Sequence, residues 1–195
     1  DFLHKPEHIN ESNHKIVANG ILDLSKENQR DRFFAGVLSS YKDDIYSFSY
    51  GTASGEYYGA RITEDGAIQI MRNNASTGGN SWYYQVEEDL SIVELVVQAG
   101  QFDPRTRVWY KAAVAANGPT FSPIYRHFIM DDLAISYACP VYGPDGSLRG
   151  VLGTHILLGD IGAYLHDTVM GYNGYAVIVE KSTNQLVATS MGIDH

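Results

Sequence analysis

The N-terminal part of the chain repeats its apolar positions at the spacing of an α-helix. The clearest stripe occupies positions i, i+1, i+4, i+5 and i+8, namely Phe33, Phe34, Val37, Leu38 and Tyr41. A weaker stripe precedes it, and Gly20 stands between the two, where a glycine can interrupt or kink a helix. The pattern predicts a long N-terminal helix over residues 1–44.

Beyond residue 44 the period of the pattern changes to two. Apolar and polar residues alternate in short runs, and Gly, Asn, Asp and Ser cluster between the runs, as they do between strands joined by tight turns. Consecutive runs of this kind predict antiparallel hairpins. The predicted strands cover residues 45–52, 56–62, 67–71, 82–86, 91–98, 133–142 and 147–158.

Two shorter helices and a final hairpin complete the pattern. Asp103 can cap the first N–H groups of a helix, Pro104 suits its first position, and Asn117 opens the Asn-Gly-Pro sequence that stops it. Residues 159–170 are again amphipathic, and residues 174–191 predict strand, turn and strand. A long helix, an antiparallel sheet of about five or six strands with helices to one side, and the start of another sheet define an α+β protein.

Composition narrows the classes of function. The chain has 195 residues, 44% of them hydrophobic, and a net charge of −9, which disfavours binding to nucleic acid or to an anionic membrane surface. Its 14 tyrosines are typical of strands in the first place, and they also suit the wall of a site for a small polar ligand. Cys139 is the single cysteine, so no intrachain disulfide can form. The sequence starts and stops abruptly, as a piece of a longer protein would.

The chain lacks the short motifs of common catalytic and metal sites, including GxSxG, HExxH, phosphate-loop and CxxC patterns. His4 and His8 are four residues apart but have no third ligand nearby, so neither a metal nor a cofactor is expected. Ser122, Asp103 and His127 supply the residue types of a hydrolase triad, yet no nucleophile elbow accompanies them. A small hydrolase is therefore a remote alternative, and this domain is not expected to be an enzyme.

One short segment concentrates groups suited to an anionic ligand, and three others follow it in a characteristic order. Residues 102–114 read FDPRTRVWYKAAV and are followed by PTFSPIY at 119–125. Next come ISYACPVYGPDGSLRGVLGTHILLGDI at 135–161 and GYNGYAVIVEKSTNQLVATS at 171–190. This ordered set resembles the extracytoplasmic double Cache sensor domains of bacterial transmembrane receptors, which contain PAS-like modules.

The resemblance implies three parts. These are a long N-terminal helix (1–44), a membrane-distal PAS-like ligand-binding module (45–160) and the start of a membrane-proximal PAS-like module (161–195). The domain would be periplasmic or extracellular, in a receptor held in the inner or plasma membrane by flanking segments. Inside the cell, such receptors carry a histidine kinase of a two-component system, a nucleotide cyclase or a chemotaxis signalling domain. A homodimer along the N-terminal helix is also expected.

The resemblance also implies ligand-binding residues. In the family members that bind amino acids, Arg, Trp and Tyr hold the ligand carboxylate, and the matching residues here are Arg107, Trp109, Tyr110 and Tyr125. An arginine offers a planar fork that matches a carboxylate with two charge-assisted hydrogen bonds. Arg107 and Tyr110 are three residues apart, so a helix would place both on one face.

At three further positions the sequence departs from the amino-acid binders. His155 and His127 stand where those proteins have carboxylates for the ligand ammonium, and Phe102 replaces a tyrosine. A histidine can donate a hydrogen bond and can carry positive charge near pH 6.5, but it cannot replace an aspartate as the partner of a cation. The sequence therefore predicts a small carboxylate-bearing ligand other than an amino acid. If His127 or His155 must be protonated to hold a second anionic group, its binding should weaken as pH rises through the histidine range. The alternative is a structural, dimer-forming Cache module without a ligand.

Overall fold

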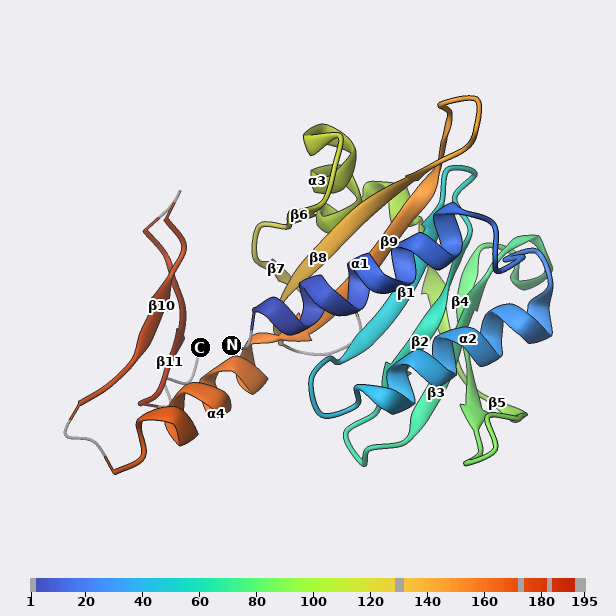
Figure 1. Cartoon of the computed structure of the whole chain (residues 1–195). Helices are drawn as coiled ribbons and strands as arrows, with labels where there is room; N and C mark the ends of the chain where they lie inside the picture. Colours follow the sequence, from blue (N-terminus) through green and yellow to red (C-terminus); the bar gives the residue numbers. More distant parts are fainter. Residues whose placement is uncertain (1–2, 129–131, 172–173, 182–183, 192–195) are drawn as a thin grey trace.

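The computed structural model describes residues 3–128, 132–171, 174–181 and 184–191, which form a mixed antiparallel sheet and helix architecture (Figure 1). This confirms the α+β class. The helices are α1 (His4–Ala18), α2 (Glu27–Ser40), α3 (Val108–Ala116) and α4 (Leu158–Val169), with 3-10 turns at Ala75–Thr77 and Pro104–Thr106. The strands are β1 (Ser47–Thr52), β2 (Tyr57–Ile62), β3 (Ile68–Asn73), β4 (Asn80–Val86), β5 (Ile92–Gln101), β6 (Thr120–Phe121), β7 (Tyr125–Arg126), β8 (Leu133–Tyr142), β9 (Leu148–Leu157), β10 (Val177–Val179) and β11 (Leu186–Thr189).

The N-terminal region forms two helices, so the prediction of one long helix over residues 1–44 is wrong. Helix α1 ends at Ala18, and Gly20 follows with φ at +66°, a left-handed conformation that favours glycine and closes a helix C-terminus. The N–H groups of Gly20 and Ile21 then bond back to Val17 O and Ile16 O. The chain turns before α2, and both helices lie over the same face of the sheet (Figure 1).

The main sheet joins strands that are far apart in the sequence. Its order is β5-β4-β3-β2-β1-β9-β8-β6, with β7 also paired to β8, and every pairing is antiparallel. It is larger than the five or six strands expected, because the pairing of β1 with β9 connects the first hairpins with the last one. In this register Ser47 lies opposite Arg61 on one side and opposite His155 on the other.

Alternation along each strand sorts the side chains between two covered faces. Phe48 of β1 and Tyr58 of β2 belong to the core under α1 and α2, which also contains Phe34 and Leu38. Tyr57, the neighbour of Tyr58, belongs instead to the core under α3. Helices therefore cover both faces, and not one face as the sequence suggested.

Buried polar groups attach α1 and α2 to the sheet. Asn10 of α1 is fully buried, and its Nδ2 donates to backbone carbonyls of β8 and β9, at 3.0 Å from Tyr137 O and 3.1 Å from Leu152 O. Asp31 of α2 is 1% exposed and forms ion pairs with Arg30 and with Arg72 of β3, the latter at 2.6 Å. These contacts tie each helix to one half of the sheet.

Helix α4 leaves the end of β9 and leads to the separate two-stranded sheet of β10 and β11. Ile161 and Leu165 of α4 pack with Val187 and Ala188 of β11 in a cluster of their own, apart from the two cores of the main sheet. Within the described residues, no helix has the length and apolarity required to cross a membrane.

Candidate functional site

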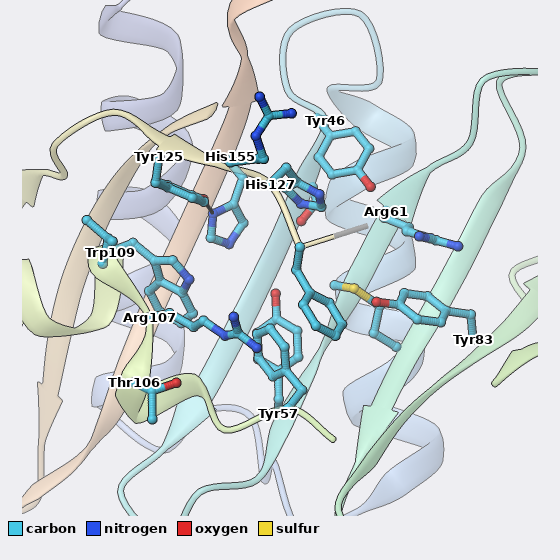
Figure 2. Close-up of a pocket in the computed structure, with 16 residues that line it drawn as sticks. Tyr46, Tyr57, Arg61, Tyr83, Thr106, Arg107, Trp109, Tyr125, His127 and His155 are labelled. Carbon is cyan, nitrogen blue, oxygen red and sulfur yellow. Dashed lines mark hydrogen bonds between the residues drawn. The ribbon is translucent and has the colours of Figure 1, made fainter. Parts of the chain in front are cut away.

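A cavity of about 150 Å³ lies on the face of the sheet that carries α3 (Figure 2). Strands β1 to β4 and β9 supply one wall, and the segments 102–109 and 125–128 supply the others. Its volume is below the roughly 300–1,000 Å³ of drug-sized sites, which suits a ligand of a few heavy atoms. The lining residues are Tyr46, Ser47, Tyr57, Arg61, Met71, Tyr83, Phe102, Thr106, Arg107, Val108, Trp109, Tyr125, Arg126, His127, Phe128 and His155.

Small side chains on the sheet make room for the large ones. The strand register places Gly59 opposite Ser49, and Ser49 opposite Gly153, in one row of three small residues on β2, β1 and β9. A Cβ on Gly153 would lie 2.8 Å from the His155 ring and 3.3 Å from Trp109. Glycine at this position therefore lets Trp109 and His155 pack together, with ring centroids 5.2 Å apart.

His155 is 2% exposed and is bonded through both ring nitrogens. Its Nε2 lies 2.6 Å from Ser49 Oγ, and its Nδ1 lies 2.7 Å from Ser136 Oγ. The Tyr125 hydroxyl joins this network at 2.7 Å from Ser136 Oγ and 3.3 Å from His155 Nδ1. Since hydroxyl groups bond to both ring nitrogens, neither nitrogen is available to a ligand. His155 instead holds Ser49, Ser136 and Tyr125 in place in the wall of the cavity.

The two histidines of the cavity are neutral near pH 7. Burial, and to a lesser extent the neighbouring His127, lowers the pKa of His155 to about 3. Burial, followed by the positive charges of Arg61 and Arg107, lowers the pKa of His127 to about 4. The expected protonation of these histidines in the range near pH 6.5 is therefore not met, because burial disfavours both imidazolium forms and two guanidinium groups add to this effect at His127.

Arg107 reaches the cavity from the residue before α3. Its backbone is extended, with φ −79° and ψ 149°, because the helix predicted from residue 104 is divided into a 3-10 turn and an α-helix that begins at Val108. Its guanidinium carbon lies 4.1 Å from the ring centroid of Phe102 and 4.7 Å from that of Phe128. Its Nε is buried without a hydrogen-bond partner among the described residues.

Tyr110 is the one candidate residue that does not line the cavity. Because Arg107 precedes the helix, the two side chains do not share a helical face as expected. The Tyr110 hydroxyl instead lies 3.5 Å from Thr52 O, and its ring packs on that of Trp109 with centroids 5.7 Å apart. The other six candidates surround the cavity, namely Phe102, Arg107, Trp109, Tyr125, His127 and His155.

Arg61 is a cavity residue that sequence reasoning missed. It is 6% exposed, and its guanidinium carbon lies 3.7 Å from the ring centroid of Tyr83. Its Nε and one terminal nitrogen donate to Gln69 Oε1, at 3.0 and 2.8 Å. The available signal was its place two residues after Gly59 and four after Tyr57, on the same face of an alternating strand.

The lining is cationic although the whole protein is acidic. Arg61, Arg107 and Arg126 border the cavity, and none of the described lining residues is an aspartate or glutamate. Arg61 is buried without a carboxylate partner among the described residues, and a buried charge is strongly unfavourable without one, so this arrangement favours an anionic ligand.

The structure separates the residues of the remote hydrolase alternative. The Ser122 hydroxyl donates to Pro123 O and accepts from Ser136 N, while Asp103 pairs with Arg105. His127 packs on Tyr46 with ring centroids 4.9 Å apart. Across the described ranges, no three His, Cys, Asp or Glu side chains gather in a way that could hold a metal ion.

Comparison with known proteins identifies the module that contains the cavity. Residues 52–163, more than half of the chain, match the family described as methyl-accepting chemotaxis protein-like, first PDC sensor domain. The matched range contains most of the cavity residues, from Tyr57 to His155. The predicted Cache-type relationship is thereby confirmed at the level of a PDC sensor domain, and the double Cache subtype stays a prediction.

Solved structures of chemoreceptor sensor domains share the fold. The ligand-binding domain of Campylobacter jejuni chemoreceptor Tlp3, in complex with 4-methylisoleucine, aligns at 17% identity with a TM-score of 0.63, covering 100% of this chain and 67% of that one. The ligand-binding domain of the Pseudomonas aeruginosa PAO1 amino acid chemoreceptor PctC, in complex with GABA, aligns at 18% identity with a TM-score of 0.59, covering 96% and 68%. At such identities the likeness concerns the fold alone.

Proposed function

This chain belongs to the family of methyl-accepting chemotaxis protein-like first PDC sensor domains, and from that premise we propose that it senses a small carboxylate-bearing ligand on the outer side of a membrane. The ligand occupies the cavity, and Arg107 receives its carboxylate. The main observation behind this proposal is that the Nε of Arg107 is buried without a hydrogen-bond partner among the described residues. The described residues that line the cavity include no acidic group. A bidentate carboxylate satisfies such a guanidinium in both charge and geometry.

The remaining lining residues complete the proposed site. Trp109 and Phe102 provide apolar walls that exclude water and strengthen the ion pair. His155 holds the Tyr125 hydroxyl and the sheet wall in position. Tlp3 was solved with 4-methylisoleucine and PctC with GABA, ligands that carry a carboxylate and also an amino group. Here an ammonium group would meet no carboxylate among the described lining residues, so amino acids are expected to bind more weakly than hydroxy or keto acids.

The arrangement of the whole receptor is part of the proposal. The PAS-like module of residues 45–160 is the membrane-distal ligand-binding module, and residues 161–195 begin a membrane-proximal one. The module lies in the periplasm or outside the cell, and the family favours a chemotaxis signalling domain over a histidine kinase or a nucleotide cyclase as the output. Dimer formation along the N-terminal helices stays a prediction, to be checked by light scattering.

Calorimetry tests the ligand class. A panel of small monocarboxylates, dicarboxylates, hydroxy acids, keto acids and amino acids would first be screened for ligands that raise the melting temperature, as a binder of the native state must. For each binder, Arg107→Gln should weaken the affinity by at least about tenfold, the order expected for lost hydrogen bonds to a charge.

The matched control is Arg105→Gln. Arg105 lies two residues from Arg107, is exposed, pairs with Asp103 and does not line the cavity, so its replacement removes the same charge and should leave affinity unchanged. Tight binding of an unmodified amino acid, or a ligand whose affinity is the same in Arg107→Gln, would contradict the proposed carboxylate site.

A further inference from the structure

Arg61 is a buried cation that lies across the cavity from the half-buried Arg107. Figure 2 shows Arg107 near Trp109 and Tyr57, and Arg61 on the other side near Tyr83 and Tyr46. Arg61 is bonded to the neutral amide oxygen of Gln69 and stacked on the neutral ring of Tyr83. Throughout the described parts of the chain, no carboxylate forms an ion pair with it.

A buried hydroxyl without a partner lies next to this cation. Tyr46 is 5% exposed and lines the cavity, and its hydroxyl has no hydrogen-bond partner among the described residues. Burial raises the pKa of Tyr46, and the nearby Arg61 opposes that rise through its positive charge and through a side-chain contact with the hydroxyl that lies outside hydrogen-bond geometry. A buried hydroxyl left unbonded is unfavourable, so this one favours a ligand group that can bond to it. Together, Arg61 and Tyr46 present donors to the same end of the cavity.

A partly buried arginine of the same sheet, Arg72, illustrates a purely structural role. Arg72 of β3 also stacks on a tyrosine, with its guanidinium carbon 4.5 Å from the ring centroid of Tyr84. On its face of the sheet, however, Asp31 and Glu27 neutralise it at 2.6 and 3.0 Å. Arg61 has the same kind of stacking and a hydrogen bond to an amide. It differs from Arg72 in that its guanidinium borders a cavity and is not paired with carboxylates.

We infer that Arg61 and Tyr46 form a second anion-binding subsite, and that the ligand is a short dicarboxylate held at one end by Arg107 and at the other by Arg61. This inference rests on the proposed function, because it assigns the far end of the same ligand. Two guanidinium groups match two carboxylates, and the small cavity restricts the spacer to a few carbons. The ligand then neutralises the buried Arg61 and the half-buried Arg107 at once.

The test compares diacids with their own monoamides. The probes are unbranched dicarboxylates of about three to six carbons, each paired with the monoamide that has the same shape and one charge fewer. For the best-fitting diacid, calorimetry should show affinity at least about tenfold above that of its monoamide, since a hydrogen-bonded charge pair is lost. Arg61→Gln should bring this ratio close to one, whereas Arg107→Gln should weaken both members of the pair.

Two further variants separate binding from folding. Tyr46→Phe removes only a hydroxyl and should weaken diacid binding by about tenfold, with the monoamide far less affected. Arg72→Gln makes the same substitution in the same sheet at a site outside the cavity, so it should lower the melting temperature and leave the diacid-to-monoamide ratio unchanged.

The possible results divide clearly. Equal affinity for diacid and monoamide, or an Arg61→Gln variant and a Tyr46→Phe variant that both keep the native ratio, would overturn the second subsite while leaving the carboxylate site at Arg107 intact. If no carboxylate of any kind binds, the proposed function fails and this inference fails with it.

Discussion

Ser49 Oγ lies 2.6 Å from His155 Nε2, which joins β1 to β9 across 106 residues of sequence. With Ser136 on the other ring nitrogen, the imidazole is held between two hydroxyls from the strands on either side of it. One nitrogen of a neutral imidazole donates and the other accepts, so both hydroxyls can be satisfied while the ring is neutral. His155 of β9 therefore links the side chains of β1 and β8 through hydrogen bonds at the centre of the sheet.

This arrangement predicts that acid destabilises the protein through His155. In the unfolded chain a histidine takes up a proton below about pH 6.5, whereas burial keeps the folded pKa near 3. Between these values the unfolded state binds more protons. The contribution to the free energy of unfolding is therefore fully present above about pH 6.5 and is lost as pH falls, by roughly 1.4 kcal/mol per pH unit.

Urea unfolding of the native protein and of His155→Phe, at pH values from about 7 to about 4.5, would measure this contribution. The variant should lose stability at neutral pH, by about 1–3 kcal/mol for each hydroxyl left without a partner. It should also show a shallower decline with acid, by about one proton. Parallel pH profiles for the two proteins would mean that His155 does not remain neutral in the folded state.

Gly153→Ala should both destabilise the protein and weaken ligand binding. The new Cβ would lie 2.8 Å from the His155 ring, which cannot move without breaking its two hydroxyl bonds, and 3.3 Å from Trp109. Overpacking of this kind is unfavourable by about 1–3 kcal/mol. Thermal unfolding and calorimetry would measure the two effects, with Gly174→Ala as control, because a Cβ there meets no neighbour within 4 Å. A variant with native melting temperature and affinity would show that the row of small residues is not needed.

Asp31→Ala should lower stability without altering ligand selectivity. Asp31 is almost fully buried between Arg30 and Arg72, and removing it leaves two cations without their central partner. Breaking a buried ion pair in this way is unfavourable by about 3–5 kcal/mol. Chemical denaturation gives the stability, and calorimetry on the folded variant gives the selectivity. A changed preference among carboxylates would indicate that the two faces of the sheet are coupled.

Affinity for the carboxylate ligand should be nearly constant from about pH 6.5 to about pH 8. The arginines remain charged throughout this range, and both cavity histidines have folded pKa values well below it, at about 4 for His127 and about 3 for His155. The structure therefore predicts no pH dependence in this range. The weakening with rising pH that was expected from the sequence required histidines that titrate near their ordinary value. Affinity that falls steeply as pH rises through this range would show that the bound anion draws a proton onto His127.

The sequence by itself determined the longer strands and the class of fold. Alternation with period two identified β1, β2, β8 and β9, because the side chains of a strand point alternately to its two faces. The ordered motifs around Arg107, Trp109 and His155 indicated the family. These features depend on residues that are close together in the chain, so a single sequence carries them.

The tertiary structure decided which distant residues meet. The register across β2, β1, β9 and β8 places Arg61, Ser47, His155 and Ser136 in one row, and no local pattern encodes that pairing. Burial within this row set the charge state of His155, since desolvation disfavours the charged form of an imidazole. Turn geometry before α3 directed Arg107 into the cavity and left Tyr110 outside it. Gly20 divided the N-terminal helix because its left-handed conformation allows α2 to fold back onto the sheet beside α1.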